Sequence, residues 1–153
     1  NVFTLKRRLF GVHTISFFFR NDVYFKGFYF DKTPKAKAKL CALDADSITG
    51  DSFTKTEDAV TKIGNNVSLI FSDMSFSSAS RITIFGRAKD YANSINIKIL
   101  GADGSAKTER IEFDHSDDYT EQTFELGKIQ GKVEVSFIFL PGSNFDFKWF
   151  RFE

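Results

Sequence analysis

Hydrophobic and polar residues alternate over most of the chain after residue 66, which is the pattern of β-strands with one buried face. The alternation predicts seven strands, at residues 67–71, 82–85, 95–99, 110–113, 122–126, 133–139 and 145–152. Asp103-Gly104, between two of them, is a dipeptide typical of hairpin turns. Between residues 40 and 153 no segment has the spacing of an amphipathic helix. We therefore expect an all-β fold, an antiparallel β-sandwich.

The predicted loops fall into two sets, because alternate loops share one end of the sandwich when successive strands run antiparallel. One set, at residues 76–80, 101–105 and 127–131, carries little chemistry. The other set, at residues 61–66, 87–94, 114–119 and 141–144, carries most of the polar and aromatic loop side chains: Arg87, Tyr91, His115, Tyr119 and the asparagines Asn65, Asn66, Asn93 and Asn144. Binding groups commonly lie on loops held by a rigid scaffold, so we expect a binding site at this second end.

The chain contains an internal repeat. Residues 11–19 match residues 131–139, and residues 25–30 match residues 147–152, with a loop two residues longer in the second copy. One Gly, one Ser, one Lys and five Phe are identical between the copies. Because the second copy ends one module, the first copy is interpreted as the end of another.

This interpretation divides the chain into three parts. Residues 1–31 would be the C-terminal hairpin of a preceding similar module, residues 32–39 a lysine-rich solvated linker, and residues 40–153 one complete module. The consecutive Phe17, Phe18 and Phe19 make both faces of their strand apolar, so the hairpin must be covered. It could instead belong to the same sandwich, or pack on its own neighbour or on a second chain. The sequence leaves these alternatives open.

Composition narrows the function classes. The 153 residues carry 21 basic and 20 acidic side chains, a balance that argues against nucleic-acid binding. No apolar stretch approaches the roughly 20 residues of a membrane span. The single Cys41 excludes an internal disulfide and a Cys-rich metal site, and we expect it to be buried. The missing initial Met suggests a fragment of a longer protein, while the compartment (secreted, cell-surface or cytoplasmic) stays open.

Several segments together resemble family 6 carbohydrate-binding modules, which are galactose-binding-like β-sandwiches of the jelly-roll type. They read ALDAD at 42–46, NVSLIFSDMSF at 66–76, DYTEQTF at 118–124 and FDFKWFRF at 145–152. The segments ITGDSF at 48–53 and FLPGSNFDFKWFRF at 139–152 are also similar to C-terminal modules of bacterial family 2 glycoside hydrolases of the β-galactosidase type.

The resemblance implies a sugar site at the chemically rich loops. Tyr119 occupies the position of a ring on which the sugar stacks, and Asn144 or Asp146 the position of a polar ligand. The second ring usual in the family is missing from residues 61–66, and Tyr91 is the candidate to replace it. Arg87 and Asn66, from the same set of loops, complete the candidate carbohydrate-binding residues.

The family often carries a structural calcium ion held by acidic residues of the first strand and an Asp of the last. Here Asp44 and Asp46 fit the first strand, but Lys148 stands where the last Asp is expected. We expect the Lys148 ammonium to replace the ion and to pair with one or both of these carboxylates, with calcium as the alternative.

The functional expectation is a non-catalytic carbohydrate-binding module of a bacterial glycoside hydrolase, with a β-galactoside as one candidate ligand. Asp117, Asp118 and Asp146 could supply a pair of carboxylates, but no nucleophile elbow, Ser–His set or phosphate loop accompanies them. We therefore do not expect an enzyme. The alternative is a spacer or docking module that packs on its parent enzyme and binds no sugar.

Overall fold

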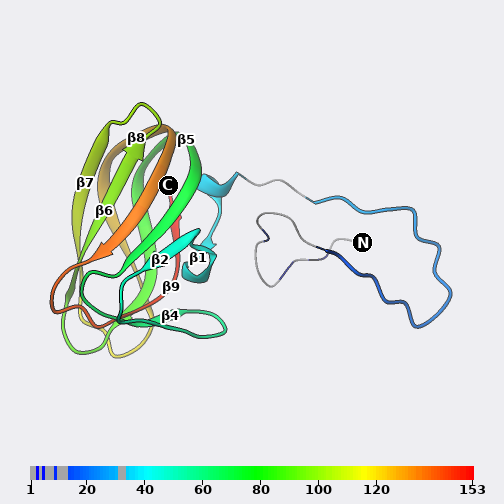
Figure 1. Ribbon diagram of the computed structural model, residues 1–153, viewed down its shortest axis with the longest axis horizontal. Helices are drawn as coiled ribbons and strands as arrows, with labels where there is room; N and C mark the ends of the chain where they lie inside the picture. Colours follow the sequence, from blue (N-terminus) through cyan, green and yellow to red (C-terminus); the bar gives the residue numbers. More distant parts are fainter. Residues whose placement is uncertain (1–2, 4, 6–8, 10–13, 31–33) are drawn as a thin grey trace. The chain divides into compact units, whose positions relative to one another are not determined.

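The computed structural model describes residues 3, 5, 9, 14–30 and 34–153. The chain divides into two compact units, Asn1–Thr33 and Pro34–Glu153. Figure 1 shows the strands of the larger unit.

The larger unit is built almost entirely of antiparallel strands, as expected from the alternating pattern. Its elements are the 3-10 helices η1 (Lys35–Lys37) and η2 (Ala42–Asp44) and the strands β1 (Leu40–Cys41), β2 (Ser47–Thr49), β3 (Thr54–Lys55), β4 (Val60–Ile63), β5 (Ser68–Ala88), β6 (Asn93–Gly101), β7 (Ala106–Phe113), β8 (Thr120–Phe139) and β9 (Phe145–Phe152). The strand order is β3-β4-β9-β5-β8-β6-β7, while β1 pairs with β9 and β2 with β5.

Two long strands, β5 and β8, hold both layers of the sandwich together (Figure 1). Residues 68–76 of β5 pair with residues 131–138 of β8, beside β2 and β6. After register shifts at residues 76–81, residues 81–86 pair with residues 120–125, beside β9. The shifts let the ribbon bend, since bulges increase local bending and twist. Its two halves thus belong to opposite layers.

The core between the layers is made largely of phenylalanine rings. Phe150 of β9 lies 4.7 Å from both Phe71 and Phe137 of the other layer, measured between ring centroids. All three rings are fully buried. Rings at these separations attract one another beyond the area that they bury. The richness of the chain in Phe therefore reflects the interior of the sandwich.

Two of the predicted loops are not loops. Residues 76–80 lie within β5, and residues 127–131 fall within β8. The serines of the first segment and the two glycines of the second suggest turns, yet both segments continue as bent strand. The 101–105 turn is present between β6 and β7.

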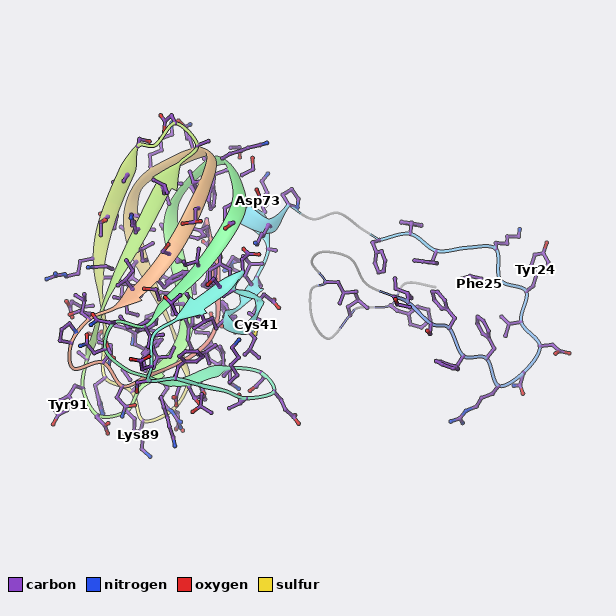
Figure 2. The ribbon with its side chains drawn as sticks, viewed as in Figure 1. Tyr24, Phe25, Cys41, Asp73, Lys89 and Tyr91 are labelled. Atoms are coloured by element: carbon purple, nitrogen blue, oxygen red, sulfur yellow. The ribbon has the colours of Figure 1, made fainter. Side chains whose placement is uncertain are left out.

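The four chemically rich loops do share one end of the sandwich. The Asn144 N–H donates to Oδ1 of Asn93 at 3.0 Å, which joins the β8–β9 connection to the start of β6. The Ser116 N–H donates to the Ala88 carbonyl oxygen at 3.0 Å, and the Asn66 N–H to that of Phe139 at 3.0 Å. We call this end the loop end; Figure 2 labels Lys89 and Tyr91 there.

Residues 34–39, expected in a solvated linker, pack on the sandwich. Ala36 is buried, and Lys35 Nζ donates to Asp46 Oδ2 at 2.7 Å and to the Ser72 carbonyl oxygen at 2.8 Å. The same Asp46 oxygen accepts the Ser72 N–H at 2.6 Å. The compact unit thus starts at Pro34, six residues earlier than the pattern suggested. Cys41, expected to be buried, is only half-buried, and its Sγ lies 3.6 Å from the Asp58 carbonyl oxygen.

Candidate functional site

Asp146, on β9, organises the polar side chains of the loop end. Its Oδ2 accepts hydrogen bonds from Nε of Arg87, at 3.0 Å, and from the neighbouring Nη2. Its Oδ1 accepts the backbone N–H of Lys62 at 2.9 Å. Pairing with Asp146 raises the pKa of the Arg87 guanidinium above its ordinary value. The site therefore has a fixed ion pair rather than two independently mobile charges.

Two local irregularities put these groups in place. β4 bulges between Val60 and Ile63, and Lys62 adopts a φ of 52°, which turns its N–H toward Asp146. A second register shift, between Phe85 and Gly86, sets Arg87 directly opposite Asp146. Gly86 is required there, because a Cβ would lie 2.3 Å from Cζ of Phe145. The strained backbone of Lys62 persists because the surrounding structure holds it in place.

The ion pair lies in a cleft of about 300 Å³ lined by Thr61, Lys62, Arg87, Lys89, Asn144 and Asp146. The Asn144 amide nitrogen contacts the Asp90 carboxylate, so this side chain is held as well. The lining combines ammonium and guanidinium donors with carboxylate, amide and hydroxyl acceptors. Such a set suits a ligand rich in hydroxyl groups, which both donate and accept hydrogen bonds.

Tyr119 is the aromatic ring next to this cleft. Its ring lies 5.0 Å from Cζ of Arg87 and 4.5 Å from Nζ of Lys148, and 5.7 Å from the Phe85 ring between centroids. The ring is half-buried, and this burial raises the pKa of its phenol above the ordinary value. Two cations thus orient a ring that keeps part of its surface open.

Lys148, which was expected to pair with Asp44 or Asp46, has a different partner. Its Nζ lies 2.8 Å from Oδ2 of Asp58, and this pairing raises the pKa of Lys148 and lowers that of Asp58. Asp46 pairs with Lys35, while Asp44 Oδ2 lies within hydrogen-bond distance, 3.3 Å, of the Cys41 N–H. The lysine side chain is long enough to reach the β3–β4 connection, which carries Asp58.

The two carboxylates named for calcium have other partners in the structure. Calcium takes about six to eight oxygen ligands, whereas a lysine ammonium already holds Asp46. Within residues 14–30 and 34–153, no three His, Cys, Asp or Glu side chains come together as a metal site. In that same part of the chain, no helix is long and apolar enough to cross a membrane.

The predicted site residues separate into two groups. Arg87, Asn144 and Asp146 meet in the cleft, and Tyr119 adjoins it through Arg87. Tyr91 and Asn66 do not line the cleft. Tyr91 is 73% exposed. Asn66 is a turn residue with a φ of 59°.

Sequence reasoning missed three lining residues: Thr61, Lys62 and Lys89. All three fall in segments that were predicted as loops, although Thr61 and Lys62 belong to β4. Nothing in the sequence marks the β4 bulge that brings the Lys62 backbone to Asp146. A larger groove, of about 430 Å³, lies at the opposite end beside residues 101–107 and 128–133. No aromatic side chain lines it, so it offers no stacking surface.

Comparison with solved structures identifies the fold. A family 6 carbohydrate-binding module from Clostridium stercorarium in complex with cellobiose matches with a TM-score of 0.65 at 20% identity, over 77% of this chain and 94% of that one. The chain has the fold of family 6 carbohydrate-binding modules. A family 6 module from Clostridium cellulolyticum in complex with xylose matches with a TM-score of 0.66 at 16% identity, over 77% and 98%.

A third family 6 fold, a β-1,3-glucan-binding module from Bacillus halodurans, matches with a TM-score of 0.65 at 17% identity, over 77% of this chain and 96% of that one. No family model and no curated protein sequence matches the chain. The family 6 fold is therefore established by structure, at identities where sequence comparison finds no relative.

Proposed function

We propose that the protein is a non-catalytic carbohydrate-binding module that holds a glycan in the cleft at the loop end. The observation that carries this proposal is the Arg87–Asp146 pair, fixed in a cleft beside the half-buried Tyr119 ring. A sugar presents a C–H face that packs on a ring and hydroxyl groups that bind charged side chains. The cleft and the ring offer both within one small area.

Each residue has a distinct role in this proposal. Asp146 and Asn144 accept hydrogen bonds from sugar hydroxyls, while Arg87 and Lys89 donate to them. Tyr119 supports the apolar face of the sugar. Lys148, 4.5 Å from the ring centre, covers part of the ring, so the sugar packs on the part that the two cations leave open.

The ligand class that we propose is supported by the structural neighbours, which were solved with cellobiose or xylose or bind β-1,3-glucan. We propose a β-linked glycan of neutral sugars, with β-galactosides included because the C-terminal segment resembles modules of β-galactosidase-type enzymes. On this proposal the chain delivers a parent glycoside hydrolase to its substrate and performs no chemistry itself.

A glycan array tests the proposal. The wild-type protein should bind a restricted set of glycans, Tyr119→Ala should lose this binding, and Tyr119→Phe should keep it because the ring is retained. Tyr91→Ala is the matched control, since Tyr91 is an exposed tyrosine at the same end that does not line the cleft. Equal binding by Tyr119→Ala and wild type would remove Tyr119 from the site.

A second candidate is a spacer that packs on its parent enzyme without binding sugar. The placement of Arg87 and Lys148 over the Tyr119 ring favours it, because cations occupy positions that a sugar would need. If the folded protein binds no glycan on the array, and Lys148→Ala binds none either, the result would support the spacer.

A further inference from the structure

The smaller unit carries an apolar face of five phenylalanine rings. Between residues 14 and 30 the side chains alternate in exposure. Five phenylalanine rings are 45–53% exposed, whereas Phe18, Tyr24 and Tyr29 are 88–93% exposed. We call the less exposed side the inner face. Figure 2 shows Tyr24 and Phe25 pointing to different sides of this segment. The inner face comprises Phe17, Phe19, Phe25, Phe28 and Phe30.

The inner rings have a defined arrangement. The Phe17 ring centroid lies 5.0 Å from those of Phe25 and Phe28. Phe19 lies 5.7 Å from Phe25, and Phe28 lies 5.6 Å from Phe30. Residues 14–30 form no strand, so ring packing rather than strand pairing brings residues 14–19 and 25–30 together.

The same arrangement recurs in the sandwich, at the residues that the internal repeat aligns. Phe137, the counterpart of Phe17, lies 5.1 Å from Phe147 and 4.7 Å from Phe150. Phe139 lies 6.3 Å from Phe147, and Phe150 lies 5.7 Å from Phe152. Four ring pairs thus agree to within 0.6 Å between the two units. In the sandwich these five rings are at most 5% exposed.

The sandwich also shows what covers such a face. Phe71, on β5, lies 5.9 Å from Phe137 and 4.7 Å from Phe150. Phe76, on the same strand, lies 5.0 Å from Phe152. The closing strands, which are residues 131–139 of β8 and the whole of β9, pair through their backbones with β1, β4, β5 and β6. These four strands are the partners for which the five-ring arrangement is built.

We propose that residues 14–30 are the closing strand pair of a second sandwich of this fold, and that their five-ring face docks on strands equivalent to β1, β4, β5 and β6. The partner is thus a β-sheet with an aromatic inner face at the positions of Phe71 and Phe76. A face of five half-exposed rings is larger than soluble proteins normally leave uncovered. The sandwich of residues 34–153 already contains its own closing strands, so the partner sheet belongs to another copy of the fold.

An extended chain tests this proposal. Residues 34–120 are placed directly ahead of residue 1, so that residues 1–30 take the place of residues 121–152 in an added sandwich, and the whole 153-residue chain is retained. Hydrogen exchange should then protect amides in residues 14–19 and 25–30 by at least about 1,000-fold, the lower end of folding equilibria for small domains. In the unextended chain the same amides should exchange freely.

Matched variants make the result specific. In the extended chain, Phe17→Ser with Phe28→Ser removes two inner rings and should abolish this protection. Phe18→Ser with Tyr29→Ser changes two outer side chains and should preserve it. Protection within residues 34–153 at the chain's own C-terminal end should stay unchanged in both variants, because that sandwich is complete.

A positive control carries residues 121–152 in place of residues 1–30 and must show protection in both sandwiches. If this control folds while residues 14–30 stay unprotected in the extended chain, the proposal is overturned. Equal behaviour of the inner and outer variants would also overturn it. So would concentration-dependent dimerisation of the unextended chain that only the inner variant abolishes, since a second copy of the chain would then cover the rings.

Discussion

Replacing Asp146 by Ala removes the acceptor on which the loop end is built. The substitution deletes three hydrogen bonds, two from the Arg87 guanidinium and one from the Lys62 N–H. It also leaves Arg87 without its counter-ion in the cleft. The β-strands themselves keep their backbone pairing, so the effect should be local to this end of the sandwich.

The size of the expected loss in stability depends on how exposed the Arg87 and Asp146 side chains are. Hydrogen bonds to charged groups stabilise by about 1.5–3 kcal/mol each when buried. Here the Arg87 and Asp146 side chains are 30% and 13% exposed, so water replaces part of what is lost. We expect Asp146→Ala to lower the free energy of unfolding by about 2–3 kcal/mol, well below the simple sum of three bonds. For a unit of this size that is a fall in Tm of about 8–12 °C.

Chemical denaturation of wild type, Asp146→Ala, Arg87→Ala and the double variant measures the coupling directly. We expect a coupling energy of about 1.5 kcal/mol between the two side chains. The Arg81–Glu153 pair is the control, since its side chains are 49% and 31% exposed and Arg81→Ala should cost less than about 0.5 kcal/mol. A coupling energy no larger than that of the control pair would refute the view that Asp146 organises the cleft.

Three further predictions concern the supports of the site. Gly86→Ala should destabilise the protein by about 1–3 kcal/mol, because the new Cβ overlaps Phe145; unchanged thermal unfolding would show that the ring moves aside freely. Asp58→Asn should cost less than about 1 kcal/mol, because the Asp58 side chain is 67% exposed. Pairing lowers the Asp58 pKa, so the difference should be present above about pH 4 and vanish as pH falls through the lowered value; a difference that does not change with pH as the carboxylates become protonated would contradict the pairing. A chelator should leave the Tm unchanged. Stabilisation by added calcium would show instead that the protein binds the calcium ion that Lys148 was expected to replace.

The fold was predictable because its signal is local. Alternating residues mark the strands. Arg87 at the end of β5, Tyr119 before β8 and Asn144 before β9 gather at one end because β5 and β8 each bend back midway, as two antiparallel strands joined by a turn would. The continuous bends of β5 and β8 were not predictable, since serines and glycines suit a turn and a bulged strand equally well. Which of the two forms depends on pairing with a distant strand.

The site was predictable in composition but not in arrangement. Asp146 and Arg87 were both singled out, yet their contact depends on the register shift at Gly86 and on the left-handed backbone of Lys62. Lys148 pairs with Asp58 rather than with Asp44 or Asp46, because tertiary geometry decides which carboxylate a long side chain reaches. The packing of Lys35 on Asp46 and Ser72 was missed for the same reason, since a lysine-rich sequence predicts a solvated segment.

The most direct measurement of the central claim is an amide NMR titration of the protein with cellobiose, a xylose oligomer, a β-1,3-glucan oligomer and lactose. We predict that at least one glycan shifts the amide signals of Lys62, Arg87, Tyr119, Asn144 and Asp146, while those of residues 101–107 at the opposite end stay in place. Shifts confined to another surface, or none with any of the four glycans at millimolar concentration, would contradict carbohydrate binding in this cleft.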